Sequence, residues 1–174
     1  EVTGVVGGTN ALELIDIQGP ANSTVIFDST VRSASVSMGA GLAAFNDDLT
    51  GNIKFSADGI VTLAGSKTID GDVTTTNANQ GTLNFLGAAT VTGEIGTTKA
   101  IKAINAESGD VSFVRAVNAQ NINLGGFAIS FGGDVTGAIS LDGTWMTVAD
   151  GANVKGTIDN ATDSITRLIL SGAS

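Results

Sequence analysis

The sequence contains no cysteine, no histidine and no tyrosine, and it has one proline and one tryptophan among its 174 residues. Without histidine and cysteine, the chain cannot assemble a Ser-His-Asp or Cys-His catalytic set, nor the usual zinc sites. The lack of cysteine also fits a protein that is exported unfolded through a pore, because no premature disulfide can lock a loop that has to thread. These absences remove several large classes of enzyme.

Basic residues are scarce as well. Eight lysines and arginines stand against 17 acidic residues, for a net charge of −9, and they are scattered from Arg32 to Arg167. A surface that binds phosphates needs clustered positive charge, so we exclude nucleic acid and anionic membranes as partners. No apolar run approaches the ~18 residues of a membrane span, and the opening EVTGVVGG lacks the features of a signal peptide. We expect no membrane insertion by this segment. We interpret it as a mature or excised part of a longer protein.

Glycine is abundant, with 24 residues, nearly twice the average share of about 7%. Most other polar positions are Thr, Asn, Ser and Asp, which suit strands and turns. Strong helix formers are few, and no stretch keeps an apolar face at helical spacing. The composition therefore predicts an all-β fold.

The stretch 81–98, GTLNFLGAATVTGEIGTT, alternates apolar or glycine residues with polar ones from Leu83 to Ile95, and Leu86 is the one large exception. Such alternation indicates a strand with one buried face, but an ordinary strand ends after about five or six residues. The stretches 53–63 and 131–141 behave alike. We infer that the chain bends at glycines while the same side stays inward.

Short segments headed by glycine recur at 51 (GNIKF), 71 (GDVTT), 93 (GEIGT), 109 (GDVSF), 133 (GDVTG) and 156 (GTIDN). Their mean spacing of about 21 residues favours a parallel β-helix with one coil per repeat. Asp-Gly pairs at 58–59, 70–71, 142–143 and 150–151 leave hairpins as an alternative. We predict one solenoid over 1–174, with less regular coils in 1–50 and regular coils in 51–174.

Several local features follow from this interpretation. Gly71 and Gly93 should lie on adjacent coils. Strands are expected over 11–18, 24–31 and 36–42, a loop over 43–48 and a brief helical turn over 100–105. The phenylalanines expected to stack as one apolar column are Phe55, Phe85, Phe113 and Phe131, although they could instead fill separate layers of a sandwich.

The segments GTLNFLGAATVTGEIGTTKAI, GDVSF, GGDVTGAISLDG and TVADGANVKGTI resemble passenger-domain sequence of Gram-negative autotransporters. They are most similar to the rickettsial surface cell antigens, a family of outer-membrane autotransporters that includes adhesins. The resemblance is best over about 51–159. It implies a β-helical passenger on the bacterial cell surface, attached to the outer membrane through a translocator barrel that we expect to be absent from this segment.

Paired carboxylates are the remaining candidates for chemistry. Asp47 and Asp48 are adjacent, and Asp70 and Asp72 flank Gly71, with Lys67 nearby. Clustered acids of this kind serve glycan hydrolysis, but acids at turns are also expected in any acidic β protein, and we interpret these as surface groups. The Gly-Gly pairs do not match the spacing of calcium-binding repeats, so we expect no metal or cofactor.

The sequence thus predicts a non-catalytic structural and adhesion module, a rigid stalk that presents loops to host or neighbouring cells. The alternative is a solenoid carbohydrate-active enzyme or a tailspike-like glycan-binding domain, although sugar clefts are usually rich in aromatic side chains. We expect Trp145 to pack against a neighbouring coil.

Expected partners are a host-cell surface protein or glycan. Self-association through open ends is also expected, because Ile165, Leu168, Ile169 and Leu170 stand near the C-terminus without an evident cap.

Overall fold

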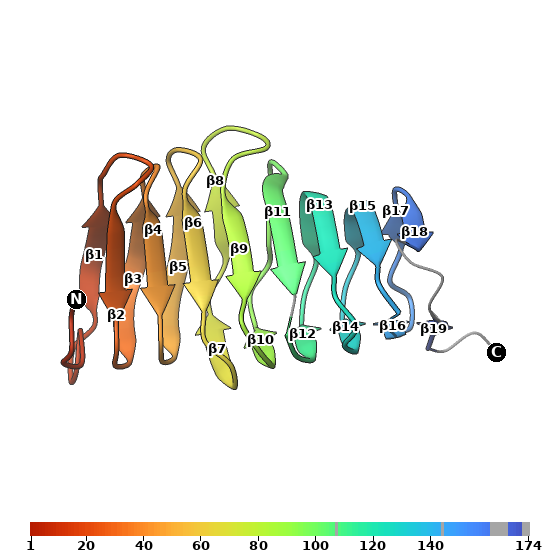
Figure 1. The fold of residues 1–174 in the computed structure, drawn as a ribbon, viewed down its shortest axis with the longest axis horizontal. Coiled ribbons are helices and arrows are strands. Elements are labelled where there is room, and N and C mark those ends of the chain that lie inside the picture. The colour runs from red at the N-terminus through yellow and green to blue at the C-terminus, as the bar shows by residue number, and fades with distance from the viewer. Residues whose placement is uncertain (107, 144, 161–166, 172–174) are drawn as a thin grey trace.

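The computed structural model describes residues 1–106, 108–143, 145–160 and 167–171, and these residues form a parallel β-solenoid that contains no helix (Figure 1). All strand pairs are parallel, and each coil lies on the coil before it. The strands are β1 (Leu12–Ile17), β2 (Thr24–Phe27), β3 (Val31–Met38), β4 (Leu42–Phe45), β5 (Leu49–Phe55), β6 (Ile60–Leu63), β7 (Lys67–Asp70), β8 (Val73–Thr75), β9 (Thr82–Phe85), β10 (Ala89–Val91), β11 (Ile101–Ala106), β12 (Val111–Phe113), β13 (Val117–Leu124), β14 (Ile129–Phe131), β15 (Val135–Leu141), β16 (Trp145–Val148), β17 (Val154–Lys155), β18 (Ile158–Asn160) and β19 (Arg167–Leu170). The predicted parallel β-helix is confirmed.

The strands form two long sheets. One runs in the order β1-β3-β5-β7-β10-β12-β14-β16-β19, with β8 beside β5, and the other runs β17-β15-β13-β11-β9-β6-β4-β2, with β18 beside β15. The solenoid has about eight turns with a spacing of about 19 residues, slightly shorter than the 21 expected. The shorter value arises because the glycine-headed segments do not all occupy one place in the coil: Gly109 packs beside Gly87, whereas Gly156 packs beside Gly137.

The core is built from the alternation that the sequence shows. Leu83, Phe85, Ala89, Val91 and Ile95 are all buried, while Leu86 points to solvent. Equivalent residues of successive coils then stack into columns through the parallel register. One such column contains Val31, Leu49, Ile69, Val91, Phe113, Phe131, Val148 and Leu170.

Glycine makes the bends between strand segments. Strand β3 has two residues between Arg32 and Ser35, but the matching part of β5 has only one, Gly51. The register between the two strands therefore shifts at this point. Gly51 has φ +139°, and a Cβ there would clash with the backbone carbonyl of Ser33. A side chain is therefore excluded both by the backbone conformation and by the close approach of the neighbouring coil.

Gly71 and Gly93 lie on adjacent coils, as predicted. A Cβ at Gly93 would meet the carbonyl of Gly71, and Val73 pairs with Ile95 two residues further along. Gly51 packs against Gly71 in the same way one coil earlier. Three successive coils therefore turn at the same glycine position.

Several local predictions are wrong, at least in part. The strand expected over 36–42 is divided, because β3 ends at Met38 and β4 begins at Leu42. Of the loop expected over 43–48, only 46–48 lie outside the strands, whereas Ala43 and Phe45 belong to β4 and are in the core. The helical turn expected over 100–105 is strand β11, which pairs with β9 and β13. Ile101 and Ile104 are both buried at a helix-like spacing. Pairing with two flanking strands decides the conformation here, whereas local spacing alone cannot.

The predicted phenylalanine column is correct in part. The rings of Phe85 and Phe113 meet edge to face with centroids 5.8 Å apart, and Phe113 stacks on Phe131 at 5.2 Å. Only Phe113 and Phe131 are register partners, whereas Phe85 belongs to the other sheet, beside Leu63 and Ala106, and meets Phe113 from across the core. Phe55 makes no ring contact with this group, and its register partners are Met38 and Thr75. Its ring packs instead against Gly81, where a Cβ would clash with it.

Candidate functional site: a hydroxyl-lined groove

The carboxylates at the glycine corners hold successive coils together. Asp72 Oδ1 accepts a hydrogen bond from the backbone N–H of Glu94 in the next coil, at 2.8 Å. Asn52 Oδ1 accepts the N–H of Asp72 in the same way, one coil earlier, at 2.9 Å. Asp70 Oδ1 accepts from the Thr92 hydroxyl at 2.6 Å. Asp70 and Asp72 therefore satisfy donors of the neighbouring coil, which agrees with their interpretation as structural surface groups.

Asp47 and Asp48 also reach the next coil. Lys67 Nζ lies 2.8 Å from Asp47 Oδ1, and the side chains of this pair are about a third exposed. Asp48 Oδ1 accepts the backbone N–H of Thr68 at 2.8 Å. The hydrogen bond from Lys67, followed by that from the Asp48 backbone N–H, lowers the pKa of Asp47 below its usual value, and Asp47 raises the pKa of Lys67. Each acid thus has a structural partner.

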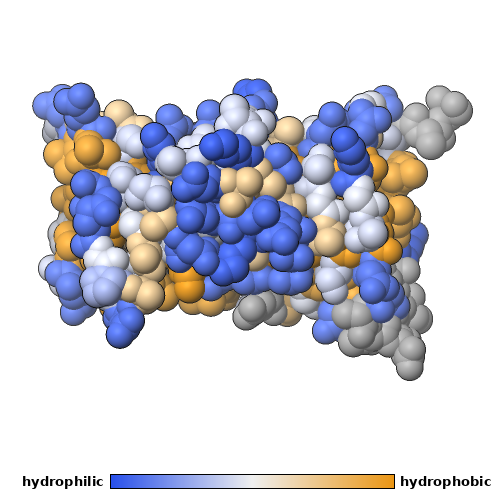
Figure 2. Space-filling model, turned by 90° about the horizontal axis from the view of Figure 1, so that it is seen from above, coloured by the Kyte–Doolittle hydropathy of each residue, from blue (hydrophilic) through white to orange (hydrophobic). Residues whose placement is uncertain are grey.

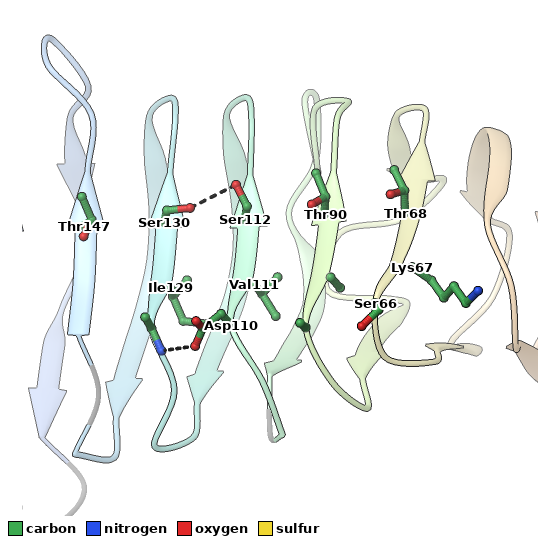
Figure 3. Close-up of a pocket in the computed structure, with 13 residues that line it drawn as sticks. Ser66, Lys67, Thr68, Thr90, Asp110, Val111, Ser112, Ile129, Ser130 and Thr147 are labelled. Carbon is green, nitrogen blue, oxygen red and sulfur yellow. Dashed lines mark hydrogen bonds between the residues drawn. The ribbon is translucent and has the colours of Figure 1, made fainter.

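A groove of about 520 Å³ runs across the outward side of β7, β10, β12, β14 and β16, which we call the groove face (Figure 3). One outward residue of each strand lies in register with the next, and these residues form a row of hydroxyl groups. The row consists of Thr68, Thr90, Ser112, Ser130 and Thr147. The hydroxyl of Ser130 donates to that of Ser112 at 3.0 Å, while Val111 and Ile129 point into the core.

Trp145 is half exposed, and the expected contact with a neighbouring coil is made by Arg167, its register partner in β19. The exposed fraction of Trp145 is 52%, and the guanidinium carbon of Arg167 lies 5.4 Å from the ring centroid. Trp145 stands at an outward position at the start of β16, directly before the buried Met146. With Phe127, Ala128 and Asp110 it lines a hollow of about 210 Å³.

Sequence reasoning missed the groove because the signal lies in the register. Thr and Ser alternate with buried residues in each strand, as in ATV and VSF, but such triplets occur wherever a strand has a wet face. Only the pairing of strands shows that five hydroxyls form one row. The residues that the structure describes contain no group of three or more His, Cys, Asp or Glu side chains that could hold a metal ion.

Comparison with known proteins supports the resemblance noted from the sequence. Over 148 residues, or 82% of the chain, the sequence is 31% identical to "Outer membrane protein A" of Rickettsia rickettsii. The match spans about 6% of the length of that relative. No protein-family model matches the chain, and no solved structure matches it. Within the described residues there is no helix long and apolar enough to cross a membrane. The predicted similarity to rickettsial surface antigens is thus confirmed.

Proposed function

We propose that this chain is a non-catalytic, rigid module of a surface-displayed passenger, and that it presents its faces to host cells or neighbouring cells. The observation that carries the proposal is the uninterrupted parallel stacking of about eight coils around one apolar core. The name of the rickettsial relative, an outer membrane protein, supports a location at the bacterial cell surface. A segment of this kind would act by holding binding surfaces at a fixed distance.

Rigidity is favoured by bonds that run from coil to coil on the outer surface as well as within the core. On the sheet of β9, β11 and β13, the Asn105 side chain donates to Asn84 Oδ1 at 2.8 Å, and the Asn123 side chain donates to Asn105 Oδ1 at 2.7 Å. These amides extend the backbone ladder along the solenoid axis. In a solenoid, stability comes from such contacts between neighbouring repeats, so the module resists bending between coils.

Catalysis is disfavoured by what the acidic side chains already do. Retaining and inverting glycosidases place two carboxyl groups across the scissile bond. Here Asp47 is paired with Lys67, whereas Asp48 and Asp72 accept backbone N–H groups. The four acids that the sequence offered for chemistry are engaged in holding coils together, and this supports a binding and display role.

Self-association through the ends is part of the proposal. Figure 2 shows apolar surface at both ends of the solenoid and a largely hydrophilic middle. Leu12 and Leu14 are 44% and 54% exposed at one end, and Leu168 and Leu170 are 46% and 57% exposed at the other. Because all coils are parallel, one end presents the strand edge that complements the other end. Ile165 lies outside the described residues.

The end contacts can be tested by sedimentation velocity. The purified chain should increase in mass with concentration, and added salt should strengthen association by screening the charge of −9. The double variant Leu14→Lys with Leu168→Lys should stay monomeric, and Leu86→Lys, which alters an exposed leucine in the middle of the solenoid, should associate normally. A monomeric wild type at all concentrations would count against open ends.

Adhesion is tested with beads coated with the folded chain and added to cultured epithelial cells. We expect more attached beads than with albumin coating, and competition by the soluble chain. Coating with chain unfolded in urea provides a matched control for composition and charge. Equal attachment of folded-chain and albumin beads would refute the adhesion role, and release of reducing ends from polysaccharides would refute the non-catalytic one.

A further inference from the structure

The solvent-exposed aromatic rings gather in one place. Six of the seven phenylalanines are buried in the core, and the sequence has no tyrosine. The two remaining rings, Phe127 and Trp145, are 42% and 52% exposed. Both line the same hollow, whose wall also includes Gly126 and Gly143. An exposed aromatic ring loses the burial that stabilises a core residue, so two of them in one hollow indicate a surface that contacts something else.

The hollow continues into the groove. Asp110 and Ala128 line both depressions, so the two rings stand beside the row of hydroxyls on the groove face. The row has one hydroxyl per coil, and coils repeat at the ~4.8 Å separation of neighbouring strands. One sugar ring adds a similar length to an extended chain. An oligosaccharide laid along the solenoid axis could therefore meet one hydroxyl for each sugar.

The backbone hydrogen-bonding groups of the groove face are already paired with neighbouring strands. Strands β10, β12 and β14 are each paired on both sides within the long sheet, so they offer no free edge to which an extended peptide could add as a further strand. A ligand on this face bonds chiefly to side chains. Serine and threonine hydroxyls donate and accept hydrogen bonds, which matches a ligand that itself carries many hydroxyl groups.

The charges around the groove are few and largely balanced. Lys67 at one end is paired with Asp47. Asp110 at the rim accepts the N–H of Ala128 through Oδ1 at 2.9 Å, so a ligand hydroxyl would be offered its other oxygen. Arg167 lies against the Trp145 ring. With a net charge of −9 on the whole chain, this lining is complementary to a neutral ligand rather than to a polyanion.

We propose that the groove and the hollow together form a binding site for an extended, neutral glycan. One sugar ring packs its apolar face on Trp145 or Phe127, and the following sugars lie along the row from Thr147 through Ser130 and Ser112 toward Thr90. Asp110 fixes the orientation of the chain by accepting a sugar hydroxyl. The inference names the ligand class of the proposed adhesion module and rests on that function for its biological meaning.

Trp145 is the single tryptophan of the chain, so its fluorescence reports directly on the hollow. Cellohexaose, mannohexaose and maltohexaose are titrated into the purified chain, with a heparin hexasaccharide as the anionic comparison. We expect at least one neutral hexasaccharide to change the emission saturably, and the heparin fragment to leave it unchanged. Absence of a saturable change with every neutral sugar at millimolar concentration, or a response to heparin alone, overturns the proposal.

Variants locate the site. Phe127→Ala keeps the fluorescent reporter and should weaken binding of the responding sugar at least tenfold, as should the double variant Ser112→Ala with Ser130→Ala. Trp145→Ala is measured by calorimetry, with the same expectation. Leu86→Ala removes an equally exposed apolar side chain outside the groove and should bind as the wild type does. Undiminished binding by all three groove variants would place the sugar elsewhere and refute the assignment.

The bead assay separates this inference from the adhesion function on which it rests. If beads coated with Phe127→Ala or Ser112→Ala/Ser130→Ala attach to cells as wild-type beads do, adhesion stands and its ligand is held outside the groove, for example as a protein receptor. If wild-type beads fail to attach while the hexasaccharide still binds, the glycan site stands and the adhesion function fails.

Discussion

The middle and the last described coil of the solenoid place the same kind of residue in different surroundings. Phe113 and Leu170 belong to one column, connected through Phe131 and Val148. Phe113 is 1% exposed, whereas Leu170 is 57% exposed. Both are apolar residues of short strands. The difference arises because neighbouring coils cover Phe113 on both sides. Whether a residue is buried in this fold therefore depends on the coils stacked against its strand and not on the strand alone.

The largest effect is expected at a glycine bend that a neighbouring coil covers on each side, in strand β5. Gly51→Ala places a Cβ against the Ser33 carbonyl at φ +139°, and we expect a loss of about 4 kcal/mol or more in the free energy of unfolding. Gly8→Ala, near the N-terminal end, meets nothing within 4 Å and should be nearly neutral. Urea denaturation followed by circular dichroism measures both, and similar midpoints for the two variants would contradict the role of close coil contact.

The next effect concerns the column itself. Phe113→Ala removes a ring that contacts Phe85 and Phe131, and should cost about 3–5 kcal/mol. Leu170→Ala, in the same column, should cost about 1 kcal/mol or less, because little of its surface is removed from water. The same denaturation experiment compares them. Equal losses would mean that the last coil is covered in solution, as end-to-end association would produce.

Smaller effects are expected at the carboxylates of the corners. Asp72→Ala leaves the Glu94 N–H without its acceptor and should cost about 1 kcal/mol. Asp72→Asn should stay within about 0.5 kcal/mol, because Asn52 performs the same task one coil earlier. The comparison is made by urea denaturation at neutral pH, and equal destabilisation by both variants would show that charge matters more than the hydrogen bond.

The smallest effect is the pH dependence of the Asp47–Lys67 pair. The pKa of Asp47 is lowered from 3.8, so its contribution is present above about pH 4 and is lost as the pH falls through the lower folded value. The pKa of Lys67 is raised from 10.5, so its contribution is complete below that pH and is lost as the pH rises through the folded value. Thermal melts should show Lys67→Met slightly less stable than the wild type at pH 7 and equal to it at strongly acidic pH. A difference independent of pH would exclude the ion pair as its cause.

Much of the fold could be predicted from the sequence because inward-facing and outward-facing residues alternate along each strand, and this alternation is visible in consecutive residues. From Ile53 to Leu63 and from Phe131 to Leu141, the expected inward positions are buried or partly buried. The local errors at 43–48 and 100–105 arise where short apolar segments lack clear alternation. For those segments only pairing with flanking strands selects the extended conformation.

The candidate site could not be predicted in the same way. Trp145 was expected to be buried or partly buried because it lies in a strand beside an apolar residue. It occupies an outward position of β16 and is 52% exposed, and Met146 takes the inward position. The carboxylates were located correctly as surface groups, but their hydrogen bonds to the next coil depend on the register. Nothing in the sequence distinguished Phe127, which is exposed, from the other members of the set of seven phenylalanines.

The sequence by itself determined that the chain is all-β, that it bends at glycines and that apolar residues lie on one side of its strands, because these properties depend on residues that are neighbours along the chain. The tertiary structure decided which residues lie above one another. Phe55 leaves the phenylalanine group, the hydroxyls of five strands form one row, and Trp145 and Phe127 share a hollow. The physical reason is that the length of each coil varies at its corners, as at Gly51 opposite the two-residue bend of β3, and every such change resets the register between coils.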